Sequence, residues 1–264
     1  MKALIALALL VALPGANAEP CAEDGNTRVT GASQCLLMRQ FGPADAKNLL
    51  IWLHGDVSSG GAANYHFPVA KRATETLAAL SVQSVALVRP GYPDGSGDSS
   101  SVDPSQDGRS DHYTRENVAE VASAIRHLKQ RYPSGRVTMI GHSGGAATAA
   151  VILGMEPDLV DAAVLVSCPS DLTAWRINRK PWKRSENPID WTEKVSPTTR
   201  VVALTGARDD NTASDLAKRY VEALRARGIS ARFAEIGGAT HNEALRAEEV
   251  AAAIAELLQA PESK

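Results

Sequence analysis

The clearest structural signal in the chain is residues 137–145, Val137-Thr138-Met139-Ile140-Gly141-His142-Ser143-Gly144-Gly145. The first four residues form an apolar run too short for a helix, which indicates a buried strand. Residues 144–155 are rich in Ala and predict a helix. The G-x-S-x-G motif therefore stands between a strand and a helix, as a nucleophile elbow requires. Gly141 and Gly145 lack side chains that would collide in so tight a turn. Ser143 is thus the candidate nucleophile, and a plain glycine-rich connection is the alternative.

The elbow sits in a longer alternation of strands and helices that begins after about residue 34. Short apolar runs predict strands at residues 49–53, 85–88, 163–166, 201–204 and 233–236. Helical spacing of apolar residues predicts helices over 64–80, 114–131, 213–227 and 243–258. Strands that are apolar throughout are typical of a parallel sheet buried on both faces. The sequence thus predicts an α/β fold, with a mostly parallel central sheet and helices on both faces.

Composition restricts the class of protein. The chain has 264 residues, with 44% hydrophobic and 22% charged, and a formal net charge of -2. These values are typical of a globular protein and exclude a disordered or collagen-like chain. The near-neutral balance argues against a nucleic-acid partner, which would favour a strongly basic face. No segment reaches the ~20 apolar residues of a membrane-spanning helix.

The N-terminus and the cysteines predict the compartment. Met1–Ala18 reads as a signal peptide, with Lys2, an apolar core and a small-x-small cleavage site ending at Ala18. We therefore expect residues 19–264 to form a single exported domain, secreted or periplasmic. Export permits disulfides, and a bridge between Cys21 and Cys35 would hold the N-terminal segment. Cys168 follows a predicted strand and is expected to be a buried free thiol.

A serine nucleophile needs a base, and the base needs a group that orients it. Of the six histidines, His241 stands in a loop late in the chain, after a strand and before a helix. It is our candidate base. The acid is expected after another strand, between serine and histidine in chain order. Asp209 and Asp210 both satisfy this, and one of them would otherwise serve as a helix cap. We prefer Asp209 and keep Asp210 as the alternative.

Hydrolysis of an acyl bond also needs hydrogen-bond donors for the oxyanion. The backbone N–H of Gly144, directly after the nucleophile, is one candidate. The second is expected in the loop after an early strand, where His54-Gly55-Asp56 stands. We predict the Asp56 N–H, with Val57 as the alternative, and expect the Asp56 carboxylate to point away from the developing charge. His54 is expected to orient this loop by a hydrogen bond.

Two long stretches interrupt the alternation. Residues 90–113 are rich in Gly, Ser and Asp and predict a solvated loop, since their spacing does not match a calcium loop. Residues 169–197 contain three of the four tryptophans and several basic residues. A long insertion between strands is often functional. Its tryptophans and arginines suggest aromatic or anionic substrates; the alternative is that the tryptophans hold the insertion against the core.

These motifs, in this order along the chain, resemble the α/β-hydrolase superfamily. The resemblance rests on Leu53-His54-Gly55, Arg89-Pro90-Gly91-Tyr92, the elbow around Ser143, Gly206-Ala207-Arg208-Asp209 and His241, and it covers residues 35–258. It implies an eight-stranded, mostly parallel sheet, a Ser–His–Asp triad and no cofactor. No metal site is expected either, because three cysteines without a matching histidine pattern do not make a zinc site. It also implies that about 169–197 form a small cap. Asp56 departs from the glycine or bulky apolar residue that many relatives have there.

Three functions follow from these residues. The first is an exported serine hydrolase that cleaves a carboxylic ester of a small molecule through Ser143, His241 and Asp209. The alternative is an exported aminopeptidase or dipeptidyl-peptidase-like amide hydrolase, which would need an acidic pair in the pocket for the substrate ammonium. The third is a binding protein without catalysis, because a fold alone confers no function. The oligomeric state is not readable from the sequence.

Overall fold

A computed structural model of the chain describes residues 21, 26–58, 60–97, 99, 110–132 and 135–259. The expected signal peptide, Met1–Ala18, lies outside the described residues. The strands are β1 (Arg28–Thr30), β2 (Cys35–Phe41), β3 (Asn48–Leu53), β4 (Val82–Leu87), β5 (Arg136–His142), β6 (Ala162–Val166), β7 (Arg200–Gly206) and β8 (Ser230–Ile236). The helices are α1 (Phe67–Thr76), α2 (Arg115–Arg131), α3 (Gly144–Met155), α4 (Leu172–Trp175), α5 (Ser214–Ala226) and α6 (Glu248–Gln259). Short 3-10 helices are η1 (Ala78–Leu80), η2 (Pro188–Lys194) and η3 (Ala244–Arg246).

The strands form one sheet in the order β1-β2-β4-β3-β5-β6-β7-β8. All pairs from β4 to β8 are parallel, while β1 and β2 join antiparallel at one edge. The predicted α/β fold with a mostly parallel, eight-stranded sheet is therefore confirmed. The two antiparallel strands were not predicted, because β1 is only three residues long and β2 carries Arg39 and Gln40 in its second half.

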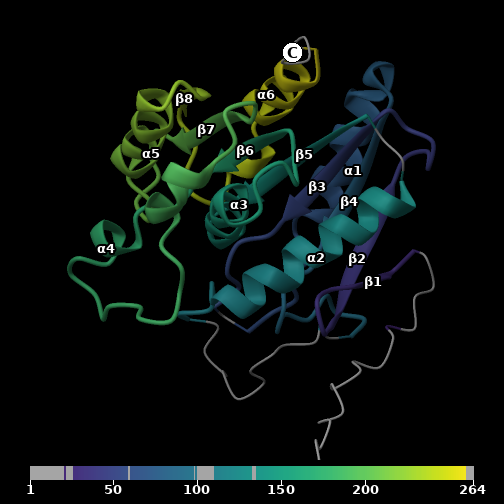
Figure 1. The fold of residues 1–264 in the computed structure, drawn as a ribbon, viewed down its shortest axis with the longest axis horizontal. Helices are drawn as coiled ribbons and strands as arrows, with labels where there is room; N and C mark the ends of the chain where they lie inside the picture. Colours follow the sequence, from purple (N-terminus) through teal and green to yellow (C-terminus); the bar gives the residue numbers. More distant parts are fainter. Residues whose placement is uncertain are drawn as a thin grey trace, which may run out of the picture.

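Helices cover both faces of the sheet (Figure 1). Successive side chains of a strand point to opposite faces, so Leu49, Ile51 and Leu53 of β3 pack with α2, α3 and α5. Leu50 and Trp52 of the same strand pack with α1 and α6 on the other face. This arrangement explains why the central strands are apolar at nearly every position. No helix in the described part of the chain is long and apolar enough to cross a membrane.

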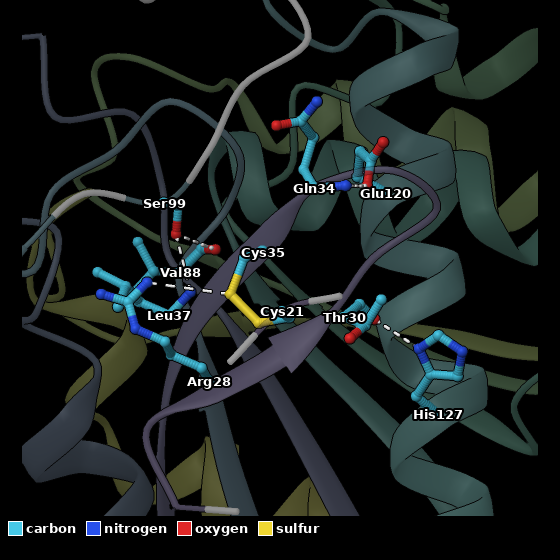
Figure 2. The surroundings of a disulfide bond; sticks show 10 residues. All are labelled: Cys21, Arg28, Thr30, Gln34, Cys35, Leu37, Val88, Ser99, Glu120 and His127. Atoms are coloured by element: carbon cyan, nitrogen blue, oxygen red, sulfur yellow. Dashed lines mark hydrogen bonds between the residues drawn. A yellow bond between two sulfur atoms is a disulfide. The ribbon is translucent and has the colours of Figure 1, made fainter. Parts of the chain in front are cut away.

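The N-terminal edge of the sheet is held by a disulfide and by hydrogen bonds to α2 (Figure 2). Cys21 and Cys35 are bonded, with Cα atoms 5.1 Å apart, and Cys168 is a buried free thiol. The carboxylate of Glu120 accepts hydrogen bonds from the turn between β1 and β2, at 3.1 Å from the Gln34 amide nitrogen. His127 Nδ1 bonds to the carbonyl of Thr30 at 2.6 Å. These contacts fasten β1 and β2 to a helix far along the chain.

The described residues of the 90–113 stretch, 90–97, 99 and 110–113, are less solvated than the sequence suggests. The described carboxylates of this stretch, those of Asp94 and Asp111, both have specific partners. The Asp94 side chain is buried and forms an ion pair with Arg39 at 2.8 Å. Asp111 accepts hydrogen bonds from the backbone N–H groups of residues 183–185 at 2.8–3.1 Å. Burial would raise the pKa of Asp111, but these hydrogen bonds outweigh it and hold the pKa below its usual value. Asp111 thus holds residues 169–197, the Trp-bearing segment, against the 90–113 stretch.

Candidate active site

The predicted elbow is formed where β5 ends and α3 begins. Ser143 has φ 52° and ψ -120°, a strained conformation for a residue with a side chain. A Cβ on Gly141 would lie 2.5 Å from the carbonyl oxygen of Gly145. One on Gly145 would lie 2.3 Å from the carbonyl oxygen of Leu53. Only glycine fits at either position, so the motif spacing follows directly from the tight packing of this turn.

The predicted acid and base meet at the ends of two neighbouring strands. Asp209 follows β7, His241 follows β8, and Nδ1 of the imidazole lies 3.0 Å from Asp209 Oδ2. The same carboxylate accepts hydrogen bonds from the backbone N–H and the hydroxyl of Thr212, both at 2.8 Å. It therefore both caps the local turn and holds the imidazole. Burial would raise the pKa of Asp209, but hydrogen bonds from His241 and Thr212 outweigh it and hold the pKa well below its usual value.

This geometry defines the tautomer of His241. Nδ1 donates to the Asp209 carboxylate, which can only accept, and Nε2 is left with its lone pair. The side-chain nitrogen of Asn211 lies 3.4 Å from Nε2. The alternative acid, Asp210, is exposed and makes no hydrogen bond to His241 within the described residues.

Ser143 and His241 line one cavity of about 700 Å³. No hydrogen bond joins their side chains in the part of the chain that the structure describes, and such contacts often tighten only when substrate is bound. Further lining residues come from the end of β5, from the Trp-bearing segment, from the loops after β3, β7 and β8, and from η3: Asp56, Tyr65, His142, Trp175, Arg176, Arg179, Trp182, Asp210, Asn211, Asn242 and Arg246. A smaller apolar cavity, about 350 Å³, lies between α1 and α6 and contains none of the predicted catalytic residues.

Asp56 lies beside the elbow with its carboxylate already occupied. One oxygen accepts hydrogen bonds from the Arg89 guanidinium at 2.6 Å and from the Tyr92 hydroxyl at 3.0 Å. The other accepts from the Tyr113 hydroxyl at 2.6 Å. Burial opposes the charge of Arg89, but the neighbouring tyrosines and Asp56 raise its pKa above the usual value. A Cβ on Gly144 would lie 2.5 Å from Asp56 Oδ1. The charge of this carboxylate is thus balanced by a buried arginine, although Asp56 lines the cavity.

The two predicted oxyanion donors, the N–H groups of Asp56 and Gly144, have no hydrogen-bond partner in the described part of the chain. A Cβ on Gly55 would lie 2.9 Å from Ser143 Cβ, so the loop after β3 lies directly against the elbow. Both amides therefore lie close to the candidate nucleophile and are available to a ligand.

A chain of hydrogen bonds that the sequence did not reveal connects the three loops of the site. The Gly55 N–H donates to the Tyr65 hydroxyl at 2.5 Å, and that hydroxyl lies 2.7 Å from His142 Nδ1. Nε2 of the same imidazole lies 2.9 Å from the carbonyl oxygen of His241, which can only accept. Nε2 is therefore the donor, and Nδ1 accepts from Tyr65. Burial, followed by repulsion from His241, lowers the pKa of His142 to about 4. The imidazole is thus neutral at pH 7.

The remaining histidines make structural contacts. His54 behaves as expected, because Nδ1 bonds to the Gly55 carbonyl and Nε2 accepts from the Arg89 N–H. His66 and His112 bond to the carbonyl oxygens of Leu87 and Pro90. No group of three or more His, Cys, Asp or Glu side chains among the described residues is placed to hold a metal ion.

Comparisons with known proteins agree with this architecture. A family model described as the alpha/beta hydrolase fold matches residues 89–192. No curated protein matches the chain. The esterase Pf2001 of Pyrococcus furiosus superposes with a TM-score of 0.67 at 19% identity, covering 90% of this chain and 91% of that chain. At such an identity, the likeness establishes the fold.

Two other solved structures share the fold. Est1E of Butyrivibrio proteoclasticus, solved with ferulic acid bound, gives a TM-score of 0.66 at 17% identity and covers 88% of this chain and 97% of that chain. The acylaminoacyl peptidase of Pyrococcus horikoshii gives 0.65 at 13% identity, covering 90% of this chain but 41% of that chain. The sheet topology, the family model and these structures together show that the chain has the α/β-hydrolase fold.

Proposed function

We propose that the chain is a serine hydrolase that cleaves a carboxylic ester of a small molecule. The observation that carries the proposal is the 3.0 Å contact between His241 and Asp209 in the cavity that also contains Ser143. A serine on a strained elbow, a histidine whose Nδ1 is held by a carboxylate, and that buried carboxylate are the parts of a catalytic triad. The esterases among the similar folds support hydrolase chemistry.

In the proposed mechanism, Ser143 Oγ attacks the ester carbonyl while His241 Nε2 takes the serine proton. The carbonyl π electrons move to oxygen, and the N–H groups of Gly144 and Asp56 stabilise that oxyanion. Collapse breaks the bond to the alcohol, which leaves with the proton from His241. A water then attacks the acyl-enzyme with the same proton transfers, which releases the acid and restores Ser143. Asp209 holds the imidazole tautomer throughout.

Amide hydrolysis would use the same residues and remains the alternative. It would require carboxylates to bind a substrate ammonium, and the cavity offers little for that purpose. Asp56 is committed to Arg89 at 2.6 Å, which leaves Asp210 as the uncommitted acid among the described lining residues. Three arginines also line the cavity. The charge of the lining therefore favours esters over peptides with a free amino terminus.

Export is part of the proposal. It rests on the signal-like sequence Met1–Ala18 and on the disulfide between Cys21 and Cys35, since such bridges persist in oxidising compartments.

The experiment compares turnover of 4-nitrophenyl acetate with that of an alanyl 4-nitroanilide. We expect ester turnover well above amide turnover, with Ser143→Ala removing both activities while the circular dichroism spectrum stays native. Full ester turnover by folded Ser143→Ala would refute the nucleophile. Faster cleavage of the anilide would favour the peptidase alternative.

A further inference from the structure

The cavity beside Ser143 carries an excess of positive charge. Arg176, Arg179 and Arg246 line it, against the carboxylates of Asp56 and Asp210. The first of these carboxylates is already neutralised by a buried arginine outside the lining, as described above. The three lining arginines are thus opposed by a single uncommitted, exposed acid. Such a concentration of guanidinium groups attracts an anion when a ligand enters.

Arg176 is held in place by groups other than a carboxylate. Its guanidinium carbon lies 4.5 Å from the ring centroid of Trp182 and 5.4 Å from that of Trp175. Nε donates to the carbonyl oxygen of Lys180 at 2.7 Å. Within the described residues it forms no ion pair of 4.0 Å or less, and its terminal nitrogens donate no hydrogen bond. Burial, and then repulsion from Arg179, lower the pKa of Arg176 despite attraction by Asp111, whose carboxylate already accepts the backbone amides of residues 183–185. A bound anion would relieve the repulsion.

The other two arginines are also without carboxylate partners in the described chain. Arg179 lies over Trp175 at 5.5 Å and contacts Asn211 Oδ1 at 3.5 Å. Arg246 ends η3, five positions after the candidate base His241, and so belongs to a different element from the other two arginines. Positive charge therefore enters the cavity both from the Trp-bearing segment and from the loop region that carries the base.

The Trp-bearing segment is held by hydrogen bonds to other parts of the chain, so Arg176 and Arg179 extend from an ordered backbone. Trp175 Nε1 donates to the carbonyl oxygen of Asn211 at 2.7 Å. Asp111 receives three consecutive backbone amides of the segment, as described above. Groups that are already ordered lose little entropy when they bind a ligand, which favours affinity.

We infer that the substrate carries a carboxylate, which Arg176, Arg179 and Arg246 bind while the ester lies against Ser143. The guanidinium group matches a carboxylate in a planar, two-point contact. This inference rests on the proposed ester hydrolysis and adds the class of substrate: an ester with a free acid group on its acyl or its alcohol part.

The test uses two pairs of esters that differ in charge and hardly in shape. The acyl-side pair is mono-4-nitrophenyl adipate and its terminal amide, 4-nitrophenyl adipamate. The alcohol-side pair is 4-acetoxybenzoate and 4-acetoxybenzamide. In at least one pair we expect kcat/KM to be about tenfold or more higher for the carboxylate, since a charge-assisted hydrogen bond has that magnitude. The preference should decrease as salt is added, because Arg179 and Arg246 are exposed.

Substitution of each lining arginine tests whether the preference for the carboxylate ester arises in the cavity. Arg176→Gln, Arg179→Gln and Arg246→Gln should each reduce the ratio within the preferred pair several-fold, mainly through KM of the carboxylate. Arg232→Gln is the matched control, because it changes net charge equally but removes a half-buried arginine of the edge strand β8, which pairs with Glu256 of α6 outside the cavity. It should leave the ratio unchanged.

The outcomes separate this inference from the proposed function. Turnover of the neutral esters with no preference for either carboxylate would refute the carboxylate inference and leave the hydrolase proposal intact. A preference that Arg232→Gln reduces as much as the cavity variants do would also refute it. If none of the esters reacts, the protection of Ser143 from a fluorophosphonate by benzoate is compared with that by benzamide. Equal protection refutes the inference, whereas no labelling at all refutes the hydrolase proposal.

Discussion

Asp209 and Asp210 are neighbours in the sequence, yet their environments differ completely. The first is buried under Thr212 and bonded to His241, while the second is exposed at the cavity. The sequence narrowed the candidate acid to these two, because the position after a strand and before His241 fits both. Which of the two contacts His241 depends on the direction in which each side chain leaves the turn. A pattern of residue types does not contain that direction.

Asp209→Asn should reduce kcat roughly 10⁴-fold with KM little changed, because an amide cannot hold the required imidazole tautomer. Asp210→Asn is the matched control and should keep kcat within about tenfold. Ester turnover of both purified variants measures the difference. A large loss in Asp210→Asn with little effect in Asp209→Asn would reverse the assignment.

Asp56 is a second residue whose surroundings the sequence does not reveal. Its partners Arg89, Tyr92 and Tyr113 lie 33, 36 and 57 positions away in the chain. Asp56→Asn would leave the buried Arg89 without a counter-charge, which costs about 3–5 kcal/mol. Urea unfolding of this variant should show such a loss. Asp215→Asn, which breaks an exposed pair with Lys218, should change stability by well under 1 kcal/mol. Equal stability of the two variants would contradict the buried pairing.

At the scale of elements, strand prediction succeeded where burial was complete. The central strands β3 to β7 lie between two helical layers, so their sequences are apolar runs that stand out. The edge strand β1 is short, and its neighbour β2 is half-buried in its second half, so neither has a comparable run. The opposite edge strand, β8, is also only partly buried, but its run at residues 233–236 was sufficient to predict it. The predicted helix over 64–80 divides into α1 and η1, which begin at Phe67 and end at Leu80.

The contact between α3 and η2 depends on Gly154, which belongs to no recognisable sequence motif. A Cβ on Gly154 would lie 2.3 Å from the carbonyl oxygen of Trp191. Gly154→Ala should therefore destabilise the protein by about 1–3 kcal/mol through overpacking. Gly237→Ala is the control, because nothing lies within 4 Å of its added Cβ. Urea midpoints measure both, and a neutral Gly154→Ala would show that the two elements separate easily.

For the whole molecule, buried neutral histidines make stability depend on pH. Burial lowers the pKa of His66 to about 3, and burial with repulsion from His241 lowers that of His142 to about 4. Unfolded histidine has a pKa near 6.5, so the unfolded chain binds more protons below that pH. The free energy of unfolding therefore has its full value above pH 6.5. It decreases as the pH falls towards 4, by up to about 1.4 kcal/mol per pH unit for each histidine.

Urea unfolding between pH 7.5 and 4.5 measures this dependence. His66→Gln should flatten the profile, because the amide does not titrate and can still donate to the Leu87 carbonyl. A wild-type unfolding free energy that stays constant from pH 6.5 to 4.5 would contradict the neutral state of both buried imidazoles.

The molecule as a whole brings five sequence-predicted residues, Ser143, Asp209, His241, Gly144 and Asp56, to the carboxyl ends of its parallel strands. The sequence could anticipate this because the ends of parallel strands meet at one edge of the sheet. The charge of the cavity was harder to anticipate. Arg176 and Arg179 were visible as basic residues, but their convergence with Arg246 depends on the path of the Trp-bearing segment.

The central claim is that Ser143 is an activated nucleophile. The most direct measurement is the intact mass of the purified protein after reaction with a fluorophosphonate, beside Ser143→Ala. We predict one adduct on the native chain, formed at a rate that falls sharply in Asp209→Asn, and none on Ser143→Ala. A folded native chain that gains no adduct, or an adduct that persists in Ser143→Ala, would contradict the account.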